Sequence, residues 1–128
     1  MFIEINFEAE QPIYSQIVHQ IIGGIARNDL SAGESLPSVR ALAADIGVNL
    51  HTVNKAYQQL KQDGYIIIHR RKGVTVHPDG PPIADEAFIE SLKAELMPKV
   101  AEAACRNLQQ EELMEIVRDI YNSFRGTE

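Results

Sequence analysis

The fold of this chain is decided by the stretch Asn49–Leu60, which reads NLHTVNKAYQQL. Four apolar residues within it recur three or four positions apart and so share one buried helix face: Val53, Ala56, Tyr57 and Leu60. The opposite face carries only polar or charged side chains, namely His51, Asn54, Lys55, Gln58 and Lys61. Asn49 is suited to cap the start of this helix, because its side-chain oxygen can accept a free backbone N–H. The stretch therefore predicts an amphipathic helix that begins just after Asn49.

A second helix is predicted immediately before this one. Pro37 or Ser38 opens it, and its inward-facing residues are Val39, Leu42, Ala43 and Ile46. Gly47 ends it, since glycine readily adopts the left-handed backbone found just past a helix. Two helices joined by so short a turn predict a helix-turn-helix, whose second helix can enter the major groove of DNA. A polar face directed only at solvent is the alternative, and this helix alone does not decide between the two.

The residues after Gly64 predict a β-hairpin with a basic tip. Tyr65–His69 is continuous and rich in β-branched residues, which is typical of a strand. Arg70-Arg71-Lys72-Gly73 forms a turn, and Val74–His77 returns as the partner strand. A solvated turn is the ordinary explanation for such a tip. Directly after a helix-turn-helix, however, the hairpin predicts the wing of a winged helix.

The N-terminal residues predict an arm followed by a buried helix. Residues 1–11 alternate apolar and acidic positions, and we expect this arm to pack on a neighbour; its apolar residues are Phe2, Ile3, Ile5 and Phe7. Pro12 fits the first position of a helix, where its missing N–H costs nothing. Isoleucine then recurs every fourth residue from Ile13 to Ile25, and Gly23-Gly24 suggests a close helix crossing. A short strand is expected at residues 34–36.

The C-terminal third predicts two helices that need a partner. Residues 78–83 form a proline-stiffened linker, and helices are expected over 84–106, with Pro98 inside, and over 110–124. About 40 residues cannot bury a core of their own. We therefore expect a second copy of the chain to cover their apolar face, with packing on the chain's own winged domain as the alternative. The residues expected to form the dimer contact are Phe88, Leu92, Leu96, Val100, Leu113, Ile116, Val117, Ile120 and Phe124.

These elements predict a mainly α (α+β) protein with three parts. Residues 1–77 form a winged helix-turn-helix domain, 78–83 a linker, and 84–128 a helical dimerisation segment. The charge is divided in the same way. The net charge is −6, yet residues 38–73 carry six Lys or Arg against two acids, whereas five bases oppose eleven acids from residue 79 onward. This distribution fits a phosphate-facing surface joined to a part that stays away from DNA.

Composition argues against several other classes of protein. A single cysteine, Cys105, cannot form an internal disulfide, which favours a reducing cytoplasm. We recognise no signal peptide, and no apolar run approaches the roughly 20 residues that span a bilayer. Metal-ligand spacing is lacking among the histidines, although His69 and His77 could meet across the hairpin; the other two are His19 and His51. We therefore expect no enzyme, no cofactor, no metal and no membrane partner.

The chain resembles the GntR family of bacterial transcription regulators over residues 12–77. The resemblance lies in Pro12-Ile13-Tyr14, in Gly33–Arg40 and in Asn49–Gly64 followed by Tyr65-Ile66. The short helical tail resembles the YtrA subfamily, whose members are small dimers that often repress transport operons. The chain is too short for the C-terminal ligand-binding domain of larger subfamilies or for a fused aminotransferase domain.

The resemblance implies a set of DNA contacts. Arg40 is expected on a phosphate, the start of the second helix on bases and backbone, and the hairpin tip at the minor groove. The full set is Ser38, Arg40, Asn49, His51, Thr52, Asn54, Lys55, Arg70, Arg71, Lys72 and Gly73. Two positions depart from the family pattern: Asn49 stands where serine or threonine is common, and Leu50 where arginine is frequent in some members. Leu50 could contact a thymine methyl or simply pack, so base specificity does not carry over.

The expected function is sequence-specific regulation of transcription by a homodimer on a pseudo-palindromic operator. One recognition helix per half-site would place the half-sites about 34–36 Å apart. The resemblance implies a repressor, with a transport operon as its target. Two other functions are weighed against it. One is a sensor gated by a small-molecule effector bound between subunits, and the other is a winged helix that binds proteins.

Overall fold

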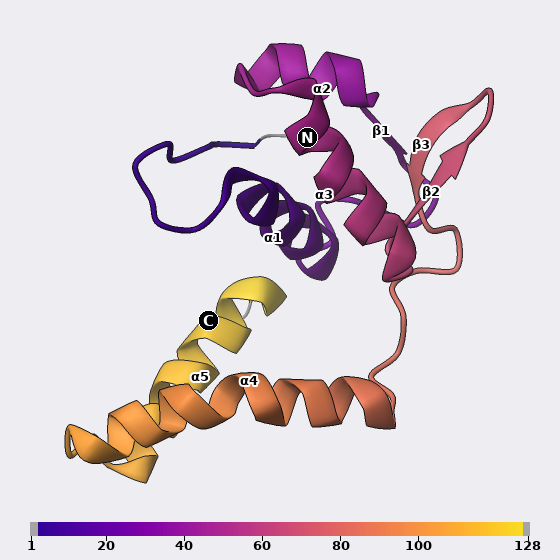
Figure 1. The fold of residues 1–128 in the computed structure, drawn as a ribbon. Helices are drawn as coiled ribbons and strands as arrows, with labels where there is room; N and C mark the ends of the chain where they lie inside the picture. Colours follow the sequence, from indigo (N-terminus) through magenta and orange to yellow (C-terminus); the bar gives the residue numbers. More distant parts are fainter. Residues whose placement is uncertain (1–2, 127–128) are drawn as a thin grey trace. The chain divides into compact units, whose positions relative to one another are not determined.

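The computed structural model describes residues 3–126, which divide into two compact units with the boundary between Pro82 and Ile83 (Figure 1). The first unit contains α1 (Ile13–Ala26), β1 (Ser35–Leu36), α2 (Val39–Ile46), α3 (Leu50–Gln62), β2 (Ile66–His69) and β3 (Gly73–Val76). The second contains α4 (Glu86–Cys105) and α5 (Gln110–Arg125). This arrangement confirms the predicted fold class, a winged helix-turn-helix followed by two helices.

Helix α3 lies at the centre of the first unit, packed against both α1 and α2. All four residues of its predicted apolar face are buried, and Tyr57 is the largest side chain that is completely enclosed. The Tyr57 hydroxyl donates a hydrogen bond of 2.8 Å to the carbonyl oxygen of Pro37, just before α2. Burial raises the pKa of this hydroxyl above its ordinary value, so the group stays protonated and remains a donor. One core side chain thus ties the start of α2 to α3.

The turn between α2 and α3 has the capping chemistry that the sequence predicts. Ser38 Oγ accepts the backbone N–H of Ala41 at 3.0 Å, which caps the start of α2. Gly47 ends α2 with a φ of +66°, a conformation that costs glycine little. Asn49 Oδ1 then accepts the N–H of His51 at 2.7 Å and caps α3. As predicted, Ser38 stands at the start of α2, Gly47 ends that helix, and α3 begins just after Asn49.

The three strands form an antiparallel sheet in the order β1-β3-β2. Ser35 pairs with Thr75, and His69 pairs with Gly73 next to the turn of the hairpin. The strands that flank the tip begin one residue away from the predicted limits, at Ile66 instead of Tyr65 and at Gly73 instead of Val74. Their inward side chains, Ile66, Val74 and Val76, join the core.

The N-terminal arm packs on α1 of the same chain, so the expectation that it packs on a neighbour is corrected. Ile3 is buried in the core. Gln20 bonds both the N–H and the carbonyl of Glu4, at 3.0 and 2.6 Å. Gln16 does the same for Asn6, at 2.9 and 3.0 Å. Each of the two glutamine amides thus bonds the backbone of the arm in the way a neighbouring strand would, a role that apolar periodicity does not reveal. Phe2, which the sequence analysis included in the arm, lies outside the described residues.

Two smaller expectations for α1 are also corrected. The helix begins at Ile13, and Pro12 precedes it as the capping residue with a ψ of 148°. The close approach at Gly24 involves the following loop and not another helix. A Cβ at Gly24 would lie 3.0 Å from Leu30 Cδ1, and the Gly24 carbonyl accepts the N–H groups of Asp29 and Leu30. Gly24 therefore lets the chain fold back tightly after α1.

The second unit consists of two helices with exposed apolar side chains, and α5 is the more clearly amphipathic of the two. Asp85 caps α4 by accepting the N–H of Phe88 at 2.9 Å, and Pro98 lies inside that helix. Asn107 ends α4 with a φ of +65°, and Gln109 and Glu112 form a capping box at the start of α5. No residue of α4 or α5 is buried. The large apolar residues left exposed are Phe88, Ile89, Leu92, Leu96, Met97, Val100, Met114, Ile116, Val117, Ile120 and Tyr121, and Leu113 and Phe124 are half-buried.

Candidate nucleic-acid interface

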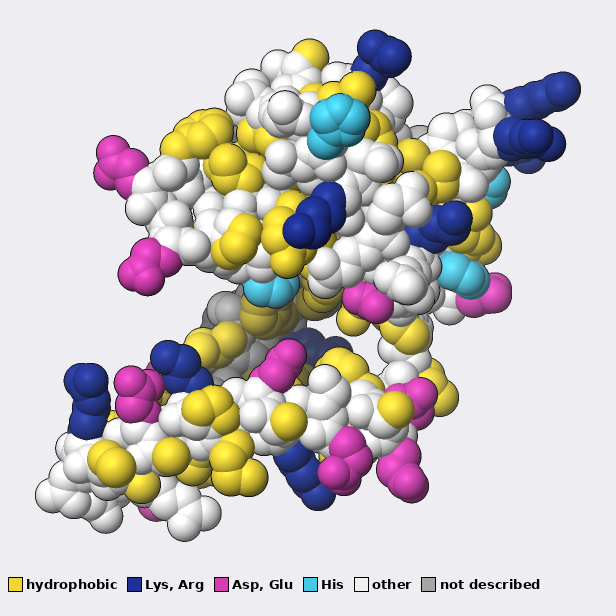
Figure 2. Space-filling model, in the orientation of Figure 1, with side chains coloured by type: hydrophobic (Ala, Val, Ile, Leu, Met, Phe, Trp, Pro, Cys, Tyr) yellow, Lys and Arg dark blue, Asp and Glu magenta, His cyan; other side chains and the backbone are white. Residues whose placement is uncertain are grey.

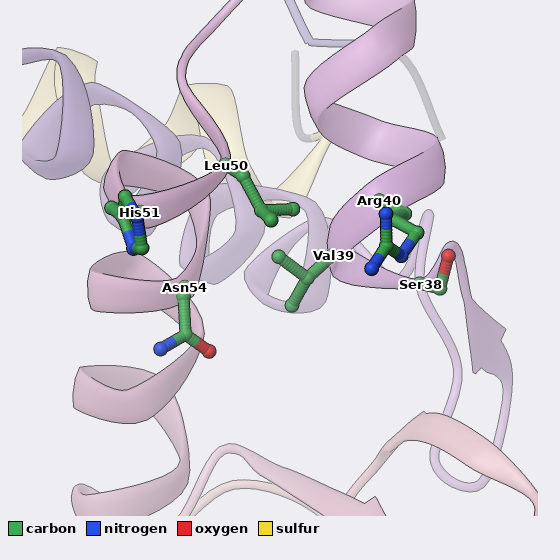
Figure 3. Close-up of a pocket in the computed structure, with 6 residues that line it drawn as sticks. All are labelled: Ser38, Val39, Arg40, Leu50, His51 and Asn54. Carbon is green, nitrogen blue, oxygen red and sulfur yellow. The ribbon is translucent and has the colours of Figure 1, made fainter.

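The starts of α2 and α3 together form a hollow at the surface of the first unit. Its volume is about 460 Å³. Figure 3 shows the side chains of Leu50 and Val39 directed toward each other across it, one from each helix. The six lining residues are Ser38, Val39, Arg40, Leu50, His51 and Asn54. The hollow therefore has an apolar floor with polar side chains on both sides.

The polar side chains of α3 divide between this hollow and its flanks. His51 and Asn54 are exposed and line the hollow, so both can reach a bound molecule. Asn49 is exposed as well, but its side-chain oxygen is engaged in capping, which leaves its amide nitrogen as the available group. Thr52 is half-buried. The start of α3 thus presents hydrogen-bonding groups suited to base edges.

Lys55 lies toward α1 instead of toward the hollow. Its ammonium nitrogen sits 4.0 Å from the centroid of the Tyr14 ring, in a cation–π contact. This contact holds the positive charge beside the start of α1. Of the DNA contacts predicted at α3, His51 and Asn54 line the hollow, whereas Asn49, Thr52 and Lys55 are not among its lining residues.

The tip of the β2–β3 hairpin carries three exposed cations, Arg70, Arg71 and Lys72. Figure 2 shows Lys and Arg side chains gathered at this tip and projecting from the body of the unit. Gly73 follows with a φ of +87°, which lets the chain turn tightly into β3. In residues 3–126 the ion pairs involve Arg27, Lys93, Lys99 and Arg118. The hairpin cations and Arg40 take part in none of these pairs.

The helix ends add to the positive character of this surface. Ser38 caps α2 and Leu50 begins α3, so the hollow lies at the N-termini of two helices. Helix N-termini carry partial positive charge and free N–H groups, which favour phosphate. Figure 2 shows Lys, Arg and His side chains over α2 and α3 on the same visible face as the hairpin tip. One face of the first unit thus combines cations, hydrogen-bonding groups and a small apolar patch.

Val39 is a site residue that the sequence analysis assigned only to the core. It is half-buried, since it packs against the core and also lines the hollow. Its position between Ser38 and Arg40, at the first turn of α2, is the signal that could have placed it at the surface. Leu50, left open between DNA contact and packing, is 38% exposed.

The sequence analysis also considered membrane-spanning helices and metal sites. None of the helices described over residues 3–126 is both long and apolar enough to cross a bilayer. Within the same residues, no group of three His, Cys, Asp or Glu side chains is placed to hold a metal ion. His69 Nε2 lies 3.0 Å from Thr75 Oγ1, and His77 Nδ1 accepts the N–H of Asp79. The two hairpin histidines are thus engaged within the fold.

Residues 13–76 match the family described as "Bacterial regulatory proteins, gntR family". The chain is 30% identical over 124 residues to the HTH-type transcriptional repressor YtrA of Bacillus subtilis, an alignment that covers 97% of this chain and 95% of that protein. Among solved structures it is similar to a transcriptional antiterminator from Listeria monocytogenes EGD-e, with a TM-score of 0.89, 27% identity, and coverage of 97% and 92% of the two chains.

A second solved structure shares a higher identity over less of the chain. YtrA from Sulfolobus acidocaldarius, a GntR-family transcription factor, is 38% identical, with a TM-score of 0.64 and coverage of 79% of this chain and 99% of that one. The family match at residues 13–76 covers the winged helix without its arm, and the alignment with YtrA of Bacillus subtilis extends over 97% of the chain. The chain is therefore a YtrA-like transcriptional regulator and belongs to the GntR family of bacterial regulatory proteins.

Proposed function

We propose that this protein is a cytoplasmic repressor that binds a pseudo-palindromic DNA operator as a homodimer. One observation carries the proposal: the exposed cations of the hairpin tip and the polar start of α3 lie on the same visible face of the first unit (Figure 2). Such a face matches the two neighbouring grooves and the phosphates of a duplex. The relative from Bacillus subtilis is named a repressor, which favours the same direction of regulation here.

Each part of the face has a distinct role in the proposed complex. Helix α3 enters the major groove, where His51, Thr52 and Asn54 supply directional hydrogen bonds to bases or sugars. Arg40 binds a phosphate beside the groove. Arg71 and Lys72 reach the phosphates that border the adjacent minor groove from the hairpin tip, and Gly73 allows the close turn that presents them. Phosphate contacts set affinity and register, whereas contacts to bases set the sequence.

The dimer is supported by the exposed apolar faces of α4 and α5. Their apolar residues, Leu92, Leu96 and Val100 on α4 and Ile116 and Ile120 on α5, are each more than two-fifths exposed. So large an apolar surface on two helices is typical of an interface between subunits. A second copy offers a complementary surface by symmetry, and the acidic character of this segment keeps it away from phosphates.

The proposed repressor also needs a regulated operon and, if it responds to a signal, an effector. By analogy with YtrA-type regulators, we expect a transport operon. A small-molecule effector would bind between the two subunits, because pockets for such ligands need about 300–1,000 Å³ and the two-helix tail can enclose that volume only with a second copy. Thermal unfolding measured against candidate ligands tests this: a rise in the melting temperature supports an effector, and no shift supports an effector-free repressor.

Selection of bound duplexes from a random pool tests the function directly. We expect an enriched inverted repeat with half-site centres about one helical turn apart. Size-exclusion chromatography with light scattering should give twice the mass of one chain. The proposal is refuted by a pool that shows no enriched sequence, or by binding that is insensitive to salt. The second result would favour a winged helix that binds proteins.

A further inference from the structure

The floor of the hollow at the DNA-facing surface is apolar, although its surroundings are polar. Leu50 and Val39 come from the first turns of two different helices and point toward each other (Figure 3). Leu50 is 38% exposed, and Val39 is half-buried. Val39 also packs against the core, which fixes its position, whereas Leu50 lies outside the core cluster. Packing within the protein therefore leaves part of Leu50 uncovered.

Polar groups on both sides restrict what this floor can bind. Asn54 and His51 lie on the α3 side, and Arg40 and Ser38 lie on the α2 side. A purely apolar partner would leave these groups without hydrogen bonds, which is costly. The fitting partner is a flat polar edge that carries one small apolar group.

In the major groove, one base supplies such a group. Thymine presents a C5-methyl beside its O4 acceptor, while the other base edges show only donors and acceptors. We propose that the Leu50–Val39 floor receives the C5-methyl of a thymine in each half-site, so that Leu50 determines specificity at that base pair. The adjacent Asn54 is then placed to bond the edge of a neighbouring base. This inference rests on the proposed function, because it requires α3 to lie in the major groove.

Replacing thymine with deoxyuridine tests the inference, because it removes only the methyl group. The probe is a duplex selected by the wild-type protein from a random pool, resynthesised with each thymine of one half-site replaced singly by deoxyuridine. Burying one methyl-sized group is worth about a fourfold change in affinity. We expect one position to show this fourfold loss with the wild-type protein, and the loss to disappear with Leu50→Ala.

Two further variants keep the test specific to Leu50. Leu50→Met retains an apolar side chain and should keep the fourfold loss at that position. Phe7→Ala removes another exposed apolar side chain, 61% exposed and not part of the hollow, and should also keep it. Circular dichroism on each variant checks that the helices are intact before binding is compared.

The outcomes separate this inference from the function on which it rests. If the wild-type protein enriches no duplex, the proposed function fails, and this inference fails with it. If the protein binds but deoxyuridine lowers its affinity at no position, the methyl contact is overturned while the repressor function stands. The same conclusion follows if deoxyuridine lowers the affinity of Leu50→Ala and of the wild type equally at every position. A fourfold loss that depends on Leu50 supports the contact.

Discussion

The hairpin tip offers the sharpest quantitative test of DNA binding. Arg70, Arg71 and Lys72 are exposed, and neither they nor Arg40 take part in an ion pair between residues 3 and 126. If each of these four cations neutralises one phosphate, a dimer makes about eight such contacts. Each contact contributes about −0.9 to the slope of log affinity against log salt, so the wild-type slope should be about −7. Between 50 and 200 mM salt, affinity should then fall about 10⁴-fold.

Lys72→Ala removes two of these contacts from the dimer. The slope should become about −5.4, and the same change in salt should lower affinity only about 10³-fold. Because phosphates are the same in every sequence, the variant should weaken binding to the operator and to a scrambled duplex by the same factor. The measurement is a titration by fluorescence anisotropy at several salt concentrations.

Lys93→Ala is the matched control, since it removes the same charge from α4, where the Lys93 ammonium lies 3.7 Å from a Glu90 carboxylate oxygen. The control should leave the slope unchanged. Our assignment of the hairpin tip to DNA is refuted if Lys72→Ala has the wild-type slope, or if it weakens binding to the operator alone. A slope reduced by about one unit instead of two would show that only one hairpin of the dimer reaches a phosphate.

Three other variants test separate parts of the molecule. Asn54→Ala should cost about 1–3 kcal/mol on the selected operator and relax the preference at one base pair; equal losses on operator and scrambled duplexes would remove Asn54 from base recognition. Tyr57→Phe deletes the bond to Pro37, so thermal unfolding should show a loss of about 0.5–1.5 kcal/mol. Burial raises the Tyr57 pKa in the folded state above 10, its value in the unfolded chain, so the unfolded chain releases the proton first as pH rises. The wild-type protein should therefore lose stability beyond pH 10, and Tyr57→Phe should lose less. Urea unfolding at pH 9 and pH 11 measures the difference. Leu96→Glu places a charge on the exposed apolar face of α4 and should give single subunits by light scattering; a variant that stays dimeric would place the interface elsewhere.

The periodicity of the sequence was sufficient to predict the winged helix. Val53, Tyr57 and their neighbours are apolar at helical spacing because α3 is enclosed by α1 and α2, and burial leaves a pattern that is visible without coordinates. Caps such as Ser38 and Gly47 are equally local, since each acts on backbone groups within a few residues. The limits of α2 and α3 therefore agreed closely with the structure.

Contacts between distant residues were not predictable in this way. Gln16 and Gln20 read as ordinary polar positions, yet both hold the N-terminal arm through hydrogen bonds that span at least ten residues. Gly24 suggested a helix crossing, whereas its close neighbour is Leu30 in the next loop. The cation–π contact of Lys55 with Tyr14 depends on how α1 packs beside α3. In each case the partner is chosen by tertiary packing, which no local pattern records.

The residues that line the hollow were predictable only in part, and its shape was not: Ser38, Arg40, His51 and Asn54 were expected at a site, whereas Val39 was not. The cations of the hairpin and the polar start of α3 follow from their place in the sequence. The hollow does not, because its floor joins Val39 and Leu50, which lie eleven positions apart on two helices. Their distance depends on the turn at Gly47 and on the bond from Tyr57 to Pro37.

That bond from Tyr57 also implies how the protein should behave when cells are warmed. The two walls of the hollow are held in place by the same side chain that fills the middle of the core. The hollow should therefore be lost only when the first unit unfolds, and small domains of this size melt cooperatively. We expect the first unit to lose its DNA-facing hollow abruptly on heating, over the few degrees in which it unfolds, instead of gradually with temperature.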